Sequence, residues 1–419
     1  MNTLQEHIKN YRLTFIVFIK WFIASIIIGI VVGLVSTFFA YGMSFATTQF
    51  HTYSWLLYLL PLGGLIIVGI YKLLDNKYNS GTNLILAAIH SNEKVPLRIT
   101  PLIIGSTIIT HLFGGSAGRE GAALQIGGSI GDYLSKLLHI DKLDRKIFIM
   151  CGMSAAFSAL FGTPVAAAIF SLEVTTVGIL HYSALFPCIF SSVIANQIAR
   201  HLGVGAERFN VGIIPEFNLY HGIRIMLIVL ICTEIGVLFC MFLHYMENLF
   251  KTRFKNEYLR IIISGCIIIL LTLIVGTRDY NGAGVNIIEA CFEGEVVPYA
   301  FLLKIIFTAV TLSGGFKGGE IVPSFTVGAA SGFLMASIFG MSPGISTACG
   351  MIAVFCSVTN CPIASLLIGL EMFGFEGINY FMITVALAHL LSGYHSLYHS
   401  QKFAVSKTQP IIYDIFNKK

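Results

Sequence analysis

Residues 151–174 read CGMSAAFSALFGTPVAAAIFSLEV, and residues 349–372 read CGMIAVFCSVTNCPIASLLIGLEM. The two segments align without gaps, and 9 of their 24 positions are identical: Cys, Gly, Met, Ala, Phe, Pro, Ala, Leu and Glu. Composition alone could supply some matches among small apolar residues, but it does not explain a proline, a phenylalanine and a glutamate in register. The pair therefore indicates an internal repeat.

A second pair of segments lies upstream at nearly the same offset. Residues 114–120 read GGSAGRE, and residues 314–320 read GGFKGGE. Repeats with interruptions in matching positions are typical of transporters, where the halves meet at a binding site near the middle of the bilayer. The predicted organisation is a cytoplasmic N-terminus (1–12), a first membrane repeat (13–200), a linker (201–221), a second membrane repeat (222–400) and a cytoplasmic tail (401–419).

The composition indicates an integral membrane protein. Of the 419 residues, 56% are hydrophobic and 11% are charged, whereas a soluble protein carries about 25% charged residues. A soluble fold with this composition could not cover its surface with polar groups. The same numbers exclude a soluble enzyme, a nucleic-acid binder and a disordered scaffold, and the net charge of +5 is too small to suggest a polyanion-binding surface.

The apolar stretches predict an all-α, polytopic fold in the lipid bilayer, because a membrane-spanning helix needs about 20 apolar residues. Leu13–Phe45 reads as a long, tilted helix, and several later stretches are shorter and broken by glycine or proline, as at Gly162-Thr163-Pro164 and Asn360-Cys361-Pro362. Broken helices are tolerated at membrane depth where they are buried or line a cavity. Basic clusters at both ends of the chain place both termini in the cytoplasm. The later stretches are Trp55–Leu74, Ile99–Phe113, Ile147–Phe161, Pro164–Leu180, Ala184–Ile198, Ile223–Met246, Ile261–Val275, Tyr299–Leu312, Ile321–Phe339, Ala348–Val358, Ile363–Phe373 and Phe381–Leu391.

Nothing in the sequence indicates catalysis, a metal or another cofactor. The nine cysteines lie in apolar surroundings without a CxxC pair, which is typical of small buried residues. Gly131-Asp132 superficially resembles an aspartyl membrane protease, but a second aspartate in a matching span is missing, since Asp279 lies in a polar turn. HExxH does not occur, and GxSxG matches only within the glycine-rich segment, at residues 114–118 and 127–131. A nucleophile elbow joins a strand to a helix, which the apolar helical stretches here do not predict, so we expect no enzyme.

The glycine-rich segments predict an anion site. In residues 114–131, GGSAGREGAALQIGGSIG, the clustered glycines interrupt one helix, and a new helix is expected to begin near Arg119–Gly121. Free N–H groups and the positive end of the helix dipole favour an anion at such a start. Residues 314–332 repeat the design in the second half. Two such N-termini meeting at the midplane would bind an anion and still release it.

Four ionisable residues of the two repeats are candidates for a functional or a structural role. Glu120 could gate an anion site, since its ionised carboxylate would compete with the anion, or it could merely cap its own helix. Arg119 could pair with a carboxylate or serve as a vestibule charge, with the structural role favoured. Glu173 and Glu371 are related by the repeat and lie at the ends of their helices, which favours a structural role.

At these residues the sequence resembles the CLC family of chloride channels and proton-coupled anion transporters. Residues 118–121, Gly-Arg-Glu-Gly, resemble that family's G-K/R-E-G-P motif, with Ala122 in place of the usual proline. Residues 319–323, Gly-Glu-Ile-Val-Pro, resemble its G-x-F-x-P motif, with isoleucine in place of phenylalanine. Tyr398 matches the family's tyrosine near the start of the last helix. The resemblance covers about residues 15–402.

The family's first motif, G-S-G-I-P, has a weaker counterpart. Gly81-Thr82-Asn83 fits its place, which makes Thr82 the candidate for the anion-coordinating hydroxyl, but Ser80-Gly81 could also be aligned there. The resemblance then implies a central ion held by the Thr82 and Tyr398 hydroxyls, as well as by backbone N–H groups of Glu320 and Ile321.

The resemblance also implies an outer site and an assembly. The N–H groups around Arg119 and Gly121 would form the outer site, with Glu120 as the gate whose side chain substitutes for an anion. The protein would be a homodimer with one pore per subunit. Hydroxyl donors suit a halide because they bind it reversibly.

Two departures from the family pattern bear on coupling and ion choice. Val174 stands where the chloride/proton exchangers have a second glutamate, so no carboxylate there can pass protons inward. Glu320 resembles the fluoride/proton antiporter branch, and a protonatable Glu320 could restore a proton route. Thr82 and Val322 do not match that branch. The sequence therefore favours chloride, carried by a channel-like or proton-coupled protein, with a proton-coupled fluoride exporter as the alternative.

Overall fold

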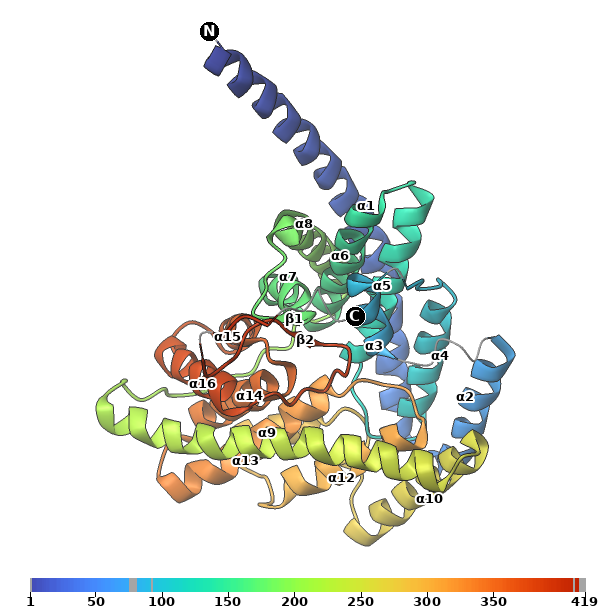
Figure 1. Cartoon of the computed structure of the whole chain (residues 1–419). Coiled ribbons are helices and arrows are strands. Elements are labelled where there is room, and N and C mark those ends of the chain that lie inside the picture. The colour runs from blue at the N-terminus through green and yellow to red at the C-terminus, as the bar shows by residue number, and fades with distance from the viewer. Residues whose placement is uncertain (1, 75–80, 92, 410, 414–419) are drawn as a thin grey trace.

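The computed structural model describes residues 2–74, 81–91, 93–409 and 411–413, with side chains from residue 11 onward, and its fold is all-α as predicted (Figure 1). The α-helices of the described residues are α1 (Asn2–Thr52), α2 (Leu60–Leu74), α3 (Thr82–His90), α4 (Ile99–Leu112), α5 (Glu120–Leu137), α6 (Lys142–Phe161), α7 (Pro164–Glu173), α8 (Leu185–His201), α9 (Leu219–Arg253), α10 (Glu257–Val275), α11 (Val285–Glu293), α12 (Ala300–Gly314), α13 (Ile321–Phe339), α14 (Pro343–Thr359), α15 (Pro362–Phe373) and α16 (Ile378–Leu391). Short 3-10 turns cover Ser54–Leu59 and Tyr182–Ala184, and the strands β1 and β2 cover Thr176–Val177 and Lys402–Phe403.

The helices α1–α8 and α9–α16 follow the same order of long and short elements, so the repeat in the sequence is also a repeat of helices. In Figure 1 the first set lies mainly in the upper part of the view and the second set in the lower part, and the N-terminal end of α1 extends away from the rest. Among the residues that the structure describes, six helical segments are long and apolar enough to cross a membrane: Tyr11–Thr52, Ser54–Leu74, Tyr182–His201, Leu219–Arg253, Glu257–Val275 and Ile321–Phe339.

Matching helix pairs cross at backbone contact in the two halves. A Cβ atom added at Gly127 on α5 would lie 2.0 Å from the carbonyl oxygen of Gly152 on α6. In the second half, a Cβ atom at Gly328 on α13 would lie 2.4 Å from the carbonyl oxygen of Gly350 on α14. Small residues let membrane helices approach this closely. These crossings hold α5 and α13, whose N-termini form the site, against their neighbours.

Each half also caps a broken helix of the other. Glu173 at the end of α7 accepts hydrogen bonds from the backbone N–H groups of Ile363 (3.2 Å) and Ala364 (2.9 Å) at the start of α15. Glu371 on α15 makes the equivalent pair with the start of α7 at the same two distances. The first N–H groups of a helix lack partners within it, and these two carboxylates satisfy them across the repeat.

The observed elements differ from the predicted stretches in three places. The first helix begins at Asn2 rather than at residue 13, so it extends beyond the apolar stretch. The stretch predicted to run to Leu180 is helical only to Glu173, after which β1 pairs in parallel with β2 in the tail. The helices α3 and α11, of nine residues each, were not predicted because neither contains a long apolar run.

The tail returns to the membrane helices and positions the segment that carries Tyr398. The Gln401 side chain donates to the carbonyl oxygens of Val174 at the end of α7 (2.8 Å) and Thr359 at the end of α14 (2.7 Å). One amide therefore joins the tail to both halves. Between α8 and α9 the chain forms a stretch without helix, and α9 begins at Leu219.

Candidate functional site

The two glycine-rich loops meet between the halves. Gly118 and Gly319 form an antiparallel bridge, with N–H to carbonyl oxygen distances of 2.7 and 2.8 Å. A Cβ atom at Gly319 would lie 2.4 Å from the backbone nitrogen of Gly121, so no larger residue fits there. The helices α5 and α13 begin directly after this bridge. Two helix N-termini, each with free N–H groups, therefore start from one point between the halves.

The Glu120 carboxylate occupies the N-terminus of α5. Glu120 is fully buried, and its Oε2 accepts a hydrogen bond from the backbone N–H of Arg119 at 3.0 Å. A helix N-terminus favours an anion, and here the side chain supplies the negative charge. This position suits a gate that an anion could replace, and it also suits the simpler role of a helix cap.

The Arg119 side chain points into the loop between α8 and α9. It forms an ion pair with Glu207, donates to the carbonyl oxygen of Leu160 at 3.2 Å, and lies 3.4 Å from Oε1 of Glu120. Its guanidinium is thus engaged by protein oxygens, while its backbone N–H contacts the gate carboxylate. The geometry resembles a structural pair more than a free vestibule charge.

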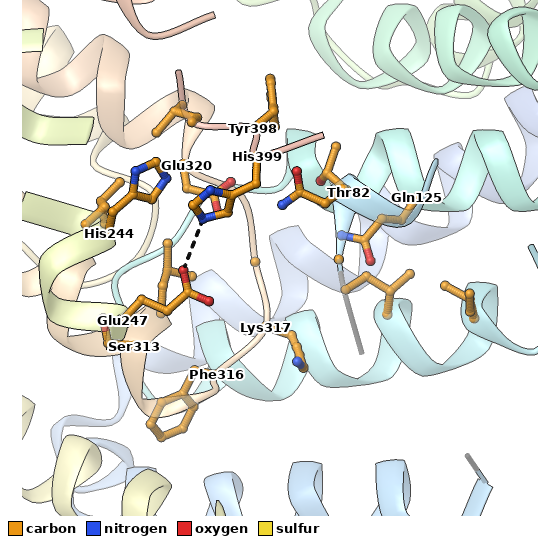
Figure 2. Close-up of a pocket in the computed structure, with 18 of the residues that line it drawn as sticks. Thr82, Gln125, His244, Glu247, Ser313, Phe316, Lys317, Glu320, Tyr398 and His399 are labelled. Carbon is orange, nitrogen blue, oxygen red and sulfur yellow. Dashed lines mark ion pairs between the residues drawn. The ribbon is translucent and has the colours of Figure 1, made fainter. Parts of the chain in front are cut away.

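A cavity of about 170 Å³ lies on the other side of the bridge and brings together Thr82, Glu320 and Tyr398 (Figure 2). Tyr398 is 3% exposed, and its hydroxyl has no hydrogen-bond partner among the described residues. A buried hydroxyl without a partner costs stability. The Tyr398 hydroxyl is therefore suited to a ligand that accepts a hydrogen bond from it. Glu120 does not line this cavity.

Thr82 and Ile321 occupy the helix starts around the cavity. Thr82 is the first residue of α3, and its hydroxyl donates to the carbonyl oxygen of Gly121 at 3.2 Å. The alternative candidate, Ser80, lies outside the described residues. Ile321 is the first residue of α13, and its side chain is buried while its backbone N–H belongs to the unpaired first turn. Glu320 precedes it and lines the cavity.

Seven polar residues of the cavity wall lie outside the motifs that resemble those of the family, so the sequence analysis missed them: Tyr71, Gln125, His244, Glu247, Ser313, Lys317 and His399. Gln125 could have been found by its helical spacing, since its side chain donates to the carbonyl oxygen of Gly121 at 3.1 Å, one turn earlier. His244 and Glu247 lie within the long apolar helix α9, where an ionisable residue is itself a functional signal.

Lys304 on α12 is a further buried ionisable residue that the sequence analysis missed. It is fully buried, and its ammonium donates to the hydroxyl of Ser116 (3.0 Å) and to the carbonyl oxygens of Gly282 (2.8 Å) and Tyr280 (3.2 Å). Three oxygen acceptors match its three donors. Lys304 therefore fixes the first glycine-rich loop to the loop before α11.

Comparison with known proteins decides the family. The family model described as voltage gated chloride channel matches residues 63–393. The chain belongs to the CLC family. It is therefore a multi-pass membrane protein with the CLC fold, and the resemblance seen in the motifs is confirmed.

Similar CLC proteins transport different halides. A "Chloride/fluoride channel protein" of Pseudomonas syringae pv. tomato is 32% identical over 93% of this chain and 87% of its own length. An "H(+)/Cl(-) exchange transporter" of Vibrio campbellii is 25% identical over 89% of this chain and 88% of its own length. The crystal structure of a CLC-type fluoride/proton antiporter matches with a TM-score of 0.88 and 32% identity, over 92% of this chain and 98% of that chain. These relatives support anion and proton transport as the activity of the family.

Proposed function

We propose that this CLC protein carries a small halide across the bilayer in exchange for protons, through a pore gated by Glu120. The observation that carries this proposal is one cavity lined by Tyr398 and Glu320, in which the Tyr398 hydroxyl has no hydrogen-bond partner within the described part of the chain. The Glu120 carboxylate lies outside this cavity, at the N-terminus of α5.

The binding steps follow from the donors. A halide entering the cavity accepts a hydrogen bond from the Tyr398 hydroxyl and from the free N–H groups at the start of α13. To pass further, it must take the place of the Glu120 carboxylate at the start of α5. Protonation removes the charge that holds this carboxylate against the N–H groups, so a proton on Glu120 opens the site to the anion.

The proton reaches the site by a route that does not use the end of α7. Val174 is fully buried and carries no titratable group. Glu320 lines the cavity together with Thr82 and Tyr398. We therefore assign to Glu320 the role of receiving a proton there.

We place fluoride first among the halides and chloride second. Fluoride is supported by Glu320 and by the similarity to a fluoride/proton antiporter over nearly the whole chain. Chloride is supported by the Thr82 hydroxyl, but that hydroxyl donates to Gly121 and would have to turn to reach an ion.

We also infer a homodimer with both termini in the cytoplasm. The family resemblance supports the dimer, and the basic residues near both ends support the orientation through the positive-inside rule. Chemical cross-linking in membranes tests the first inference, and protease access to tags at each end of the chain tests the second.

Anion efflux and internal pH, recorded together from proteoliposomes, test the function. We expect a fluoride gradient to drive proton movement, and Glu320→Gln to abolish that movement. Proton movement driven by chloride alone would make chloride the substrate. Anion efflux that requires a cation ionophore and moves no protons would refute the coupling, and unchanged coupling in Glu320→Gln would refute the role of Glu320.

A further inference from the structure

A cluster of two histidines and a glutamate forms one wall of the cavity. The imidazole rings of His244 and His399 stack with centroids 4.2 Å apart, and Nε2 of His399 lies 3.8 Å from a carboxylate oxygen of Glu247. His399 directly follows Tyr398 in the chain, and both residues line the cavity. Figure 2 shows the His399 side chain extending from the loop after α16 toward Glu247 on α9.

The cluster is open to water on one side and close to the anion site on the other. The side chains of His399 and Glu247 are 60% and 38% exposed, whereas the adjacent Tyr398 is 3% exposed. The cavity of about 170 Å³ has room for several water molecules, since one needs roughly 10–15 Å³. Glu320 and Glu247 line the same cavity.

Charged groups from every neighbouring element surround the cluster. On α9, Lys251 forms an ion pair with Glu247 at 2.5 Å. The others are His395 on the loop of His399, Glu320 at the start of α13, and Lys317 on the loop before it. Glu257 and Arg260 on α10 lie near Lys317. Because Lys251 and His399 both face Glu247, one carboxylate orients the imidazole.

We propose that His399, oriented by Glu247, is the group that loads protons from the water-filled mouth of the cavity onto Glu320. This inference rests on the proposed proton-coupled function. His399 would thus take the role of the second glutamate of the chloride/proton exchangers, whose position Val174 occupies here. Histidine is suited to the task because its charge ordinarily changes near physiological pH.

The transfer needs no other reactant. The Nε2–H bond of the His399 imidazolium breaks, and its proton passes through cavity water to form an O–H bond on the Glu320 carboxylate. The neutral imidazole then takes a proton from bulk water and returns to its charged form. His399 acts on the proton, while Tyr398 beside it acts on the anion.

The test is the variant His399→Ala in proteoliposomes, with proton flux recorded across a pH series and with free imidazole added to either side. A positioned acid–base group contributes about 10²–10⁴-fold to a proton transfer, and water in the cavity bypasses part of this. We expect proton flux to fall about tenfold and added imidazole to restore it. If His399 were only structural, added imidazole would not restore the flux. Glu247→Gln should lower the flux less, without rescue. His395→Ala, on the same loop but outside the cavity lining, is the matched control and should leave the flux unchanged.

The outcomes separate this inference from the function on which it rests. If the unmodified protein couples protons and His399→Ala transports like it, with no response to imidazole, the inference is overturned and the function stands. If the unmodified protein moves anions without protons, both are overturned. Should His399→Ala fail to fold, His399→Gln with Glu247→Gln gives the same reading, since equal fluxes in both variants and the parent contradict a loading role.

Discussion

The paired glutamates at the broken helices give the sharpest test of the fold. Glu173 and Glu371 each accept two backbone N–H groups, at 2.9 and 3.2 Å, from the start of a helix in the other half. Their geometry is the same, but Glu173 is 6% exposed and Glu371 is partly exposed. A change from carboxylate to amide at each position therefore compares burial alone.

The expected costs follow from the hydrogen bonds that are lost. In Glu173→Gln one acceptor oxygen becomes an NH2 group that faces a buried N–H, so a charge-assisted bond worth about 1.5–3 kcal/mol is lost. In Glu371→Gln water can reach the freed N–H, so we expect about 0.5–1.5 kcal/mol. The two sites share no partner, so the double variant should show the sum of both costs.

The stability of these variants is compared by heating the purified proteins in detergent. Size-exclusion chromatography then measures the fraction of each that remains folded. We expect the parent to be most stable, then Glu371→Gln, Glu173→Gln and the double variant. If Glu371→Gln loses as much stability as Glu173→Gln, or more, burial does not set the strength of these caps and the reasoning is refuted.

Three further predictions concern packing, binding and pH. Gly127→Ala should destabilise the protein by at least about 1–3 kcal/mol because its Cβ would lie 2.0 Å from a backbone oxygen, whereas Gly69→Ala on α2, where nothing lies within 4 Å, should be neutral or stabilising in the same heating assay. Tyr398→Phe should weaken halide binding about tenfold or more in titration calorimetry, since a hydrogen bond to a charged group is worth about 1.5–3 kcal/mol; unchanged affinity would remove Tyr398 from the site. Burial lowers the pKa of Lys407, in the tail, to about 8 from its usual 10.5, so the unfolded chain binds more protons between these values and stability should rise as the pH increases from about 8 to 10.5. Lys407→Met should flatten that rise, and an unchanged pH profile would contradict it.

Local patterns predicted the helix boundaries where a glycine or a proline forces them. The start of α5 at Glu120 falls where the glycine cluster ends, and α7 and α15 begin at Pro164 and Pro362, where a proline suits the first helical position. The end of α7 was not predictable in the same way. The apolar run continues to Leu180, but the chain turns after Glu173 because β1 pairs with tail residues more than 200 positions away.

The residues of the candidate site were also predictable only where a local pattern marks them. Glu120, Glu320 and Tyr398 were found because each stands in a motif whose chemistry is local to a helix start or a loop. His399 was not predicted, because it belongs to the site only through a cavity wall built from several distant elements.

The glycine-rich breaks serve the contact between the halves as much as the anion. Gly114 and Gly315 have φ values of +83° and +106°, which glycine adopts without strain. Gly319 instead is required by space, since a side chain there would strike the backbone of Gly121. A motif of this kind therefore indicates that the starts of two helices are in contact. This contact is the same whichever small anion is bound. Which halide passes, and with how many protons, depends on side chains that face the cavity, so ion choice and coupling should change through Glu320 and His399 while the glycines stay the same.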